Sequence, residues 1–358
     1  MKTQNITPVQ KPAFKKMWAN KKQTFQPKAI SVSSQKLVDI SYLQPGKSLP
    51  LVVQPQLSEL NLHIWAQNNQ EFIETNVLKY GGILFRGFDV NTQSDFEQFV
   101  NSVCPQLMHY LEGATPRTQL SDKVYTSTEF PPEHSIALHN ELSYVITWPM
   151  KIWFCCIQPA TQQGETPIAD MRKVFQRINP QIKERFMEKG WMLVRNFGDG
   201  FGLPWQRSFR TDDKQAVEAY CRNAHITTEW KDDNRLRTRQ VRPAVAQHPK
   251  TGEMVWFNHI MFWHLSSLEP QFRERFLNEF SEADLPYNTY YGDGSPIEDS
   301  VIAEIREAYQ QETIVFPWHK GDIIILDNML VAHGRNPYAG PRKILTAMGE
   351  PFTRTPNS

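Results

Sequence analysis

The sequence predicts a mainly β protein, an antiparallel jelly roll like that of cupins, with helical insertions packed on its outside. The first observation is a series of short β-prone segments that dominates the chain after its first hundred residues or so. The second is that polar and amphipathic helical segments interrupt these strands. The third is size, because 358 residues with 40% hydrophobic side chains can bury a large single core.

The first half of the chain is expected to mix helices and strands. Residues 57–79 have apolar side chains at helical spacing and end at Gly81-Gly82, where residues 83–85 begin a strand. A second helix is expected from Thr92 to Cys104, with Phe96 and Phe99 on its apolar face.

The later elements alternate between strands and helical insertions. A helix over 171–189 has Asp170 as its N-cap and Gly190 as its stop, and 241–247 pairs with 254–257 as a hairpin. The other expected strands are 151–158, 191–197, 313–316, 322–326 and 343–348. The other expected helices are 270–280 and 297–311.

The charge is uneven along the chain and suggests two parts. Eight of the 39 basic residues precede Asp39 and no acidic residue does, so the remainder has 31 basic against 38 acidic side chains. No Gly/Ser-rich or Pro-rich linker follows residue 40. We therefore expect a basic N-terminal arm, residues 1–40, and a single jelly-roll domain, residues 41–358. The arm is either a solvated extension or a contact for an acidic partner.

Composition argues against several classes of protein. The near-neutral charge weakens a role in nucleic-acid binding. The absence of a long apolar run or a secretory signal predicts no membrane partner and a cytoplasmic location. Four cysteines without a CxxC pair argue against a disulfide scaffold or structural zinc, and the adjacent Cys155 and Cys156 are expected to pack on opposite faces of one strand.

Two polar stretches carry the candidate chemistry. In extended backbone, His139 and Glu141 project to the same side, so both can meet one ion. The second stretch is a buried strand that ends in His333, with Arg342 nine residues beyond it. Two histidines and one carboxylate form the facial triad of non-haem Fe(II) enzymes, and a guanidinium pairs bidentately with a carboxylate.

This ordered set of residues resembles the signature of the Fe(II)/2-oxoglutarate dioxygenases of the taurine dioxygenase (TauD/TfdA) family. The resemblance covers roughly residues 80–350 and implies a double-stranded β-helix with Fe(II) bound by His139, Glu141 and His333. It also implies that Thr166 and Arg342 hold the cosubstrate 2-oxoglutarate, with Lys343 as the alternative to Arg342. No catalytic residue is implied beyond the metal centre, where O2 is the second cosubstrate.

The flanking segments 125–132 and 255–258 are more similar to the SyrP-like branch of the family. That resemblance implies hydroxylation of an unactivated C–H bond of an amino acid, free or as a carrier-tethered amino-acyl or peptidyl unit, in specialised metabolism of the nonribosomal peptide type. Succinate and CO2 would be released. Because related halogenases have a small residue at the position of Glu141, its presence predicts hydroxylation or desaturation. The alternatives are a catabolic dioxygenase of a small sulfonate or carboxylate, a desaturase or cyclase, and a noncatalytic jelly-roll binding protein.

The substrate pocket is less visible in the sequence. Its candidate residues are Glu129, Asn140, Asn258 and His259, with His264 as a further possibility. Cations that could meet an amino-acid carboxylate are Arg210, Arg237, Arg239 and Arg242. His134, His248 and His319 are expected to be structural or solvated, with His134 near enough to line the mouth. A small amino-acid-like substrate is the expected partner, and an acidic carrier protein would suit the basic arm. The sequence does not indicate an oligomeric state.

Overall fold

A computed structural model describes residues 37–354, except 110–117, 122, 128–129 and 201. The chain divides into two compact units, residues 1–33 and residues 34–358. Only the second unit contains described residues. The proposed basic arm therefore lies almost wholly outside the described part.

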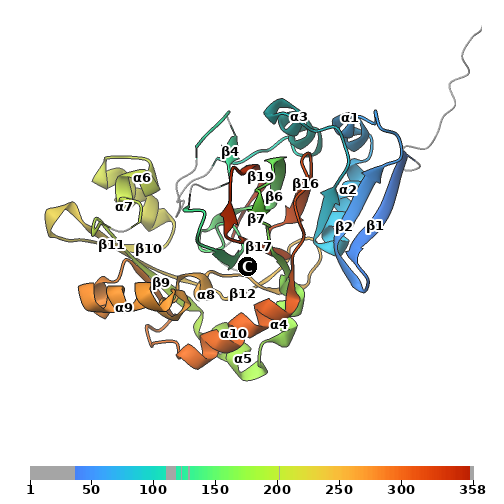
Figure 1. Cartoon of the computed structure of the whole chain (residues 1–358). Coiled ribbons are helices and arrows are strands. Elements are labelled where there is room, and N and C mark those ends of the chain that lie inside the picture. Colours follow the sequence, from blue (N-terminus) through green and yellow to red (C-terminus); the bar gives the residue numbers. More distant parts are fainter. Residues whose placement is uncertain (1–36, 110–117, 122, 128–129, 201, 355–358) are drawn as a thin grey trace, which may run out of the picture. The chain divides into compact units, whose positions relative to one another are not determined.

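Two mainly antiparallel sheets build the centre of the second unit (Figure 1). The larger sheet has seven strands in the order β1 (Val38–Gln44), β2 (Lys47–Pro55), β3 (Gly82–Phe85), β16 (Ile323–Asp327), β6 (Thr147–Gln158), β19 (Lys343–Thr353) and β4 (Val124–Thr126). The smaller sheet has β15 (Thr313–Ile314), β8 (Ile168–Asp170), β17 (Val331–Arg335) and β5 (Ile136–His139). One pair, β2 with β3, is parallel.

The core of the jelly roll lies between these two sheets. Phe154 of β6 and Ile324 of β16 pack inward in one cluster with Ile168 and Ala332 of the smaller sheet. Their neighbours Trp153, Cys155, Ile323 and Ile325 alternate to the other face and form a second cluster. Cys155 and Cys156 thus point to opposite faces as expected, and burial raises the pKa of the Cys156 thiol to about 12. The expected jelly roll with helical insertions is confirmed.

Three helices belong to the second cluster, on the outer face of the larger sheet. They are α1 (Leu62–Gln67), α2 (Gln70–Tyr80) and α3 (Gln93–Val103). The expectation of one helix over 57–79 is wrong. Asn61 caps a helix that starts later, and this helix ends at Asn68, with a second helix beginning after Asn69. The helix expected from Thr92 is confirmed, since Thr92 and Asp95 form a capping box.

Two further helices, α4 (Met171–Arg177) and α10 (Asp299–Glu312), flank the smaller sheet. The helix α5 (Pro180–Lys189) follows α4, and its Phe186 packs on Trp256 and Tyr291. The single helix expected over 171–189 is wrong. Pro180 has no backbone N–H and starts a new helix, which Asn179 caps. The N-cap at Asp170, the end at Gly190 and α10 agree with expectation.

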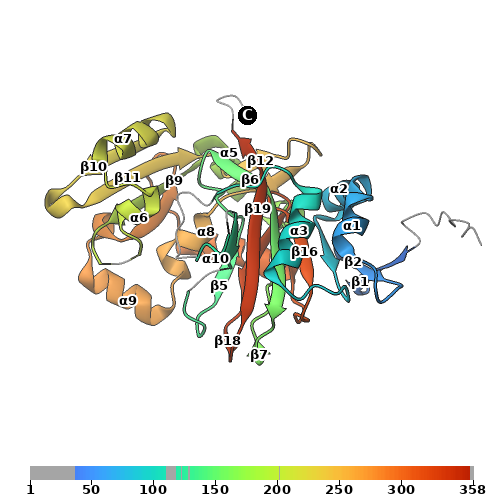
Figure 2. The ribbon, with the colours of Figure 1, turned by 90° about the horizontal axis from the view of Figure 1, so that it is seen from above.

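A further four-stranded sheet, inserted in the sequence between β8 and β15, lies beside the jelly roll (Figure 2). Its strand order is β10 (Ile226–Trp230), β11 (Leu236–Arg242), β9 (Trp191–Phe197) and β14 (Tyr287–Tyr291). The expected hairpin of 241–247 with 254–257 is shorter, because Pro243 separates β11 from β12 (Val245–Gln247), which pairs with β13 (Met254–Trp256).

The remaining elements are short or peripheral: α6 (Trp205–Phe209), α7 (Lys214–Asn223), α8 (Ile260–Trp263), α9 (Pro270–Glu279), β7 (Gln162–Gln163) and β18 (Tyr338–Ala339). Within the described part of the chain, none of the helices has both the length and the hydrophobicity needed to cross a lipid bilayer.

Candidate metal centre

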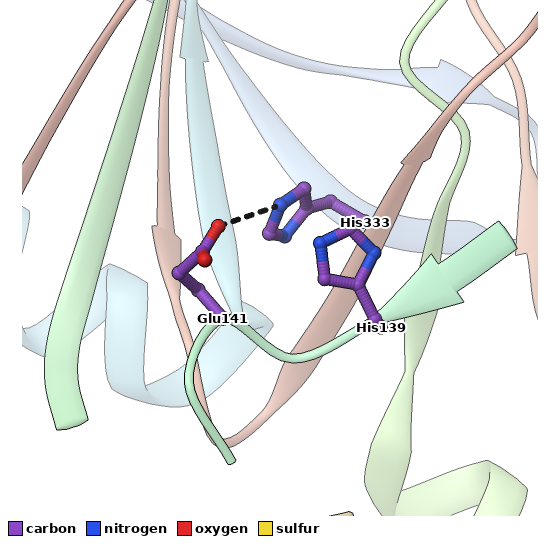
Figure 3. A group of neighbouring side chains, drawn as sticks. All are labelled: His139, Glu141 and His333. Carbon is purple, nitrogen blue, oxygen red and sulfur yellow. Dashed lines mark ion pairs between the residues drawn. The ribbon is translucent and has the colours of Figure 1, made fainter. Parts of the chain in front are cut away.

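Three side chains predicted as metal ligands converge at one end of the smaller sheet (Figure 3). His139 ends β5, Glu141 follows it in a turn, and His333 lies in the middle of β17. One ligand atom from each lies within 4.8 Å of the other two. Across the described residues no other group of His, Cys, Asp and Glu meets this criterion.

Strand pairing brings the two histidines together. β17 lies between β8 and β5, so His333 is the register partner of both Ile168 and His139. A Cβ at Gly334 would lie 2.6 Å from the backbone oxygen of Ile136, so only glycine permits this close approach of β5 to β17. Gly334 therefore sets the spacing of the two histidine-bearing strands.

Hydrogen bonding orients the ligand atoms. The Nδ1 of His139 bonds the carbonyl of Ala137 at 2.9 Å, so Nδ1 is the protonated nitrogen and Nε2 is left as the ligand atom. The Nε2 of His333 lies 3.8 Å from a carboxylate oxygen of Glu141, and Phe154 packs against the His333 ring at 4.9 Å between centroids. Two imidazole nitrogens and one carboxylate oxygen at this spacing fit Fe(II) and leave coordination positions for other ligands.

Asn328, in the turn between β16 and β17, fixes the backbone around Glu141. Its side-chain oxygen accepts from the Glu141 N–H at 2.7 Å, and its amide donates to the carbonyls of Glu141 and Pro149. Asn140 in turn donates to the Asn328 carbonyl at 2.7 Å. All these groups are buried, so the bonds hold the ligand-bearing turn firmly against the jelly roll.

Aromatic side chains form a wall beside His139. The ring of His259 lies 5.5 Å from that of His139, and it also contacts Tyr144, Phe262 and Trp263 at centroid distances of 4.8 to 5.3 Å. The His259 Nδ1 is 2.6 Å from the hydroxyl of Ser143. Burial, with smaller effects of His139 and Arg195, lowers the pKa of His259 well below 6.5, so this imidazole is neutral. The predicted pocket residue His259 therefore lies next to the candidate metal centre.

The residues predicted to hold 2-oxoglutarate meet at the segment that leads into β8: Thr166 lies in it, and Arg342, which directly precedes β19, bonds to it. Thr166 is two residues before Ile168, the register partner of His333, and its hydroxyl oxygen accepts from the Trp318 indole at 3.1 Å. The Nε of Arg342 donates to the carbonyl of Gly164 at 2.9 Å.

The Arg342 side chain is partly buried, whereas that of Lys343 is exposed. Burial, with the nearby Arg335 charge, lowers the pKa of Arg342 to about 10, so the guanidinium stays charged at neutral pH. It has no carboxylate partner in the described part of the chain. The geometry thus favours Arg342 over Lys343 as the cation on the Gly164 and Thr166 side of the sheet.

The other predicted pocket residues have different surroundings. Asn140 supports Asn328 as described. Asn258 donates to the Ala244 carbonyl just before β12 and accepts from the Ile260 N–H at the start of α8, so its amide connects these two stretches of backbone. Glu129 lies outside the described residues.

The four arginines proposed as substrate cations lie away from the metal ligands or are already bonded. Arg237 pairs with Asp284, and Arg239 with Glu229. Arg242 donates to the backbone carbonyls of Tyr144 and Ala224. Arg210 is exposed after α6, and no contact connects it to the candidate metal centre.

The remaining histidines have structural surroundings. His248 is buried and bonds Asp327 at 3.0 Å, and its Nδ1 accepts from the Lys250 and Thr251 N–H groups. His264 caps the short helix that follows α8 by accepting from the Ser266 N–H.

Two histidines lie nearer the surface. His134 lies 3.4 Å from a Glu269 carboxylate oxygen, and the side chain of His319 is exposed. Neither belongs to the candidate metal centre.

Sequence reasoning missed three residues that shape this region: Asn328, Gly334 and Arg195. Asn328 follows a buried strand, where an Asx turn is common, and Gly334 separates a candidate ligand from Arg335. Arg195 and its neighbour Asn196 are the two polar residues of an otherwise apolar strand, and a charged residue there is a signal for a special role.

Comparisons with known proteins identify the family and the fold. Residues 40–348 match the model of the family described as taurine catabolism dioxygenase TauD, TfdA family. The chain is 40% identical to the dapdiamide synthesis protein DdaC of Enterobacter agglomerans over 271 residues. This aligned region covers 76% of this chain and 82% of that protein. It is 28% identical over 321 residues to a clavaminate synthase-like protein of Arabidopsis thaliana, covering 85% of this chain and 94% of that one.

Solved structures show the same fold at low sequence identity. The PvcB protein from Pseudomonas aeruginosa has a TM-score of 0.52 at 15% identity, covering 89% of this chain and 93% of its own. A taurine dioxygenase from Burkholderia xenovorans also has a TM-score of 0.52, at 13% identity, covering 90% of this chain and 92% of its own.

Proposed function

The chain belongs to the taurine catabolism dioxygenase TauD, TfdA family, and from this membership we propose that it hydroxylates an unactivated C–H bond of an amino-acid-like substrate in specialised biosynthesis. As a member it is a dioxygenase that uses Fe(II), 2-oxoglutarate and O2. The alternative of a noncatalytic jelly-roll binding protein is therefore set aside. The observation that carries the proposal is the convergence of two imidazoles and one carboxylate within 4.8 Å.

In this proposal, His139, Glu141 and His333 hold the iron. Bound Fe(II), together with 2-oxoglutarate and O2, supplies the oxidant that removes hydrogen from a C–H bond. One oxygen atom of O2 enters the substrate as a hydroxyl group and the other enters succinate, while the C1 carboxylate of 2-oxoglutarate leaves as CO2. The protein's own task is to fix the ligands, position the cosubstrate and select the hydrogen that reacts.

Arg342 and Thr166 would bind the distal carboxylate of 2-oxoglutarate. The Arg342 Nε is engaged by the Gly164 carbonyl, which leaves its two terminal nitrogens to form a bidentate pair. The Trp318 indole donates to the Thr166 oxygen, so the Thr166 hydroxyl hydrogen is available for donation. These existing bonds orient both groups before the cosubstrate arrives, which favours binding.

Glu141 favours hydroxylation over halogenation, because a carboxylate at this position completes the protein ligand set. Desaturation and cyclisation use the same ligands and remain alternatives. They are separated from hydroxylation by product analysis with isotope-labelled O2, since only a hydroxylated product incorporates the label.

The substrate class rests on the relative with the highest sequence identity reported above. That protein is described as a dapdiamide synthesis protein, which supports a biosynthetic role. The amino-acid-like substrate is our proposal from the resemblance to the SyrP-like branch. The amino-acid-like substrate could be free or tethered to a carrier protein. The rival is a free small sulfonate or carboxylate in catabolism. A test with matched free acids and carrier thioesters separates the two, because a catabolic enzyme would turn over only the free acid.

Iron binding and cosubstrate turnover test the proposal directly. We expect Fe(II) binding by calorimetry, and succinate formation from 2-oxoglutarate, to be lost in His139→Ala. The matched control is His319→Ala, which removes an exposed imidazole and should keep both. Equal Fe(II) affinity and succinate formation in His139→Ala and the unaltered protein would contradict the proposed site.

The basic arm is a proposed contact for an acidic carrier protein, and cytoplasmic location also remains a prediction. Eight lysines and no acidic residue precede Asp39. Removing residues 1–36, which ends before β1, should weaken turnover of a carrier-bound substrate, with the largest loss at low salt because salt screens the attraction. Turnover of a free substrate serves as the control and should not change. Unchanged kinetics on the carrier-bound substrate would leave the arm without this role.

A further inference from the structure

The inserted sheet turns one face toward the metal centre. On β9, Leu193, Arg195 and Phe197 share that face, and Arg195 is paired in register with Thr238 of β11 and Tyr287 of β14. Two hydrogen bonds from the same face identify what it packs against. Thr289 of β14 donates to the Ile260 carbonyl at 3.0 Å, and Gln240 of β11 donates to the Tyr144 carbonyl at 3.0 Å.

Arg195 lies at the edge of the aromatic wall. Its guanidinium is 4.6 Å from the ring centroid of Phe197 and 5.7 Å from that of Trp263. Trp263 packs on His259 at 4.8 Å, and His259 packs on the metal-ligand candidate His139 at 5.5 Å. A continuous line of ring contacts therefore connects this cation to the metal centre.

Arg195 differs from the other arginines of the same sheet. Arg237 and Arg239 have carboxylate partners, and Arg242 donates to backbone carbonyls. In the described part of the chain, Arg195 has neither an ion pair nor a hydrogen bond, although its side chain is half-buried. Among the described side chains only ring stacking holds this guanidinium, so its N–H donors remain available to a ligand. The arrangement suits an anion that enters from outside the protein.

We propose that Arg195 binds a carboxylate of the substrate and so fixes the substrate class as an amino-acid-like acid whose carboxylate points toward β9. This inference rests on the proposed function. A planar carboxylate matches the guanidinium fork, and the rings of Phe197 and Trp263 hold that fork in place. The aliphatic part of the acid would then lie along the aromatic wall toward the metal centre. An amino-acyl thioester lacks an α-carboxylate, so a carrier-tethered substrate would need a carboxylate on its side chain.

The test measures binding without turnover. Under anaerobic conditions, Fe(II) and 2-oxoglutarate are added to the full chain and the visible charge-transfer band of their chelate is recorded. The L-amino acids and their N-acetyl forms are then titrated in parallel with the matched carboxamides. We expect at least one carboxylate to perturb the band and its carboxamide to bind at least tenfold more weakly. Arg195→Gln should weaken carboxylate binding by roughly tenfold to a hundredfold and leave carboxamide binding unchanged.

Matched variants keep the result decisive. Arg239→Gln removes a cation from the opposite face of the same sheet and should bind as the unaltered chain does. If Arg195→Gln does not fold, Arg195→Lys replaces it, because lysine keeps the charge but lacks the planar guanidinium. Its affinity for the carboxylate should fall by a smaller factor than in Arg195→Gln, and its affinity for the carboxamide should not change. The proposal is overturned if no carboxylate perturbs the band, if carboxamides bind equally well, or if the Arg195 variants bind the carboxylate unchanged.

The same experiment separates the two hypotheses. Failure of the band to form at all with Fe(II) and 2-oxoglutarate would count against the proposed oxygenase site. A normal band without any carboxylate preference would count against Arg195 alone.

Discussion

At the scale of single residues, the candidate metal centre depends on side chains that are not themselves ligands. Asn328 satisfies the backbone N–H and carbonyl on both sides of Glu141, and Gly334 allows the two histidine-bearing strands to approach. Both act on the positions of ligand atoms, whose spacing decides metal affinity. Their removal should therefore affect Fe(II) binding as well as folding.

Asn328→Ala is expected to lower the free energy of unfolding by roughly 3 kcal/mol, because three buried backbone groups lose their partner. The Fe(II) affinity of the folded fraction should fall as well, because Glu141 is no longer fixed. Urea unfolding and Fe(II) titration measure the two effects. Asn68→Ala, which removes an exposed amide from the end of α1, is the control for stability. A loss of stability no larger than that control would contradict this role.

Gly334→Ala should separate β5 from β17. The added Cβ would lie 2.6 Å from the Ile136 oxygen, and the backbone must move to relieve the conflict. We expect a loss of about 1–3 kcal/mol in stability and at least tenfold weaker Fe(II) binding, measured by calorimetry. Gly46→Ala is the control, because Gly46 has no atom within 4 Å of the added Cβ and so adds a methyl group, at a φ of 76°, without crowding a strand. Unchanged Fe(II) affinity in Gly334→Ala would show that the strand spacing is not critical.

At the scale of secondary structure, caps and prolines decide where the elements begin and end. Thr92 and Asp95 satisfy each other's backbone N–H groups at the start of α3. Thr92→Ala should therefore cost about 1 kcal/mol of unfolding free energy without changing Fe(II) binding, whereas Ser94→Ala at the next exposed position should cost less. Thermal and urea unfolding provide the measurement. A smaller loss in Thr92→Ala than in Ser94→Ala would contradict the role of the capping box.

The sequence was informative for elements with a clear period or a clear cap. The strand over 191–197 and the helix starting after Thr92 were predictable because their apolar patterns are regular. The prediction of one helix over 171–189 was wrong because the apolar spacing continues across Pro180. A helix cannot continue there, since proline has no backbone N–H to donate to the preceding turn. Strands β1 and β2 were not expected, since their formation depends on pairing with each other and with β3 rather than on local pattern.

The candidate site was predictable only in part for the same kind of reason. The proximity of His139, Glu141 and His333, the proposed metal ligands, was predictable from spacing and family resemblance. Arg195 was missed because its position beside the site results from the packing of β9 against α8, which no local pattern encodes. The proposed ligands thus follow from motifs, whereas the proposed pocket residues follow from tertiary packing.

At the scale of the whole molecule, a network of four charges joins distant parts of the chain. Lys151 in the middle of β6 bonds Glu74 of α2 and Glu350 of β19, and Lys250 bonds the same two carboxylates. Burial alone would raise the pKa of Glu74, but hydrogen bonds and charges of the two lysines outweigh it and lower the pKa below 4.5. The network therefore contributes stability above about pH 4.5 that is lost as the pH falls through the lower, folded-state value.

Glu74→Gln should remove this contribution. We expect a loss of about 1 kcal/mol at pH 7, modest because the carboxylate is partly solvated, and a flatter decline of stability between pH 5 and pH 3. Urea unfolding across this pH range provides the measurement, with the exposed Glu71→Gln in the same helix as the control. A pH profile that is parallel to that of the unaltered protein would rule out the linkage.

The inserted sheet has a consequence for how such an enzyme can diversify. The proposed metal ligands and the proposed cosubstrate residues all lie on the jelly-roll strands or the segments adjoining them, whereas Arg195, His259 and Trp263 come from the single stretch between β8 and β15. Reaction chemistry and substrate choice are thereby encoded in separable portions of one gene. A chimaera that exchanges residues 191–291 with a relative should inherit the relative's substrate while keeping its own iron and cosubstrate.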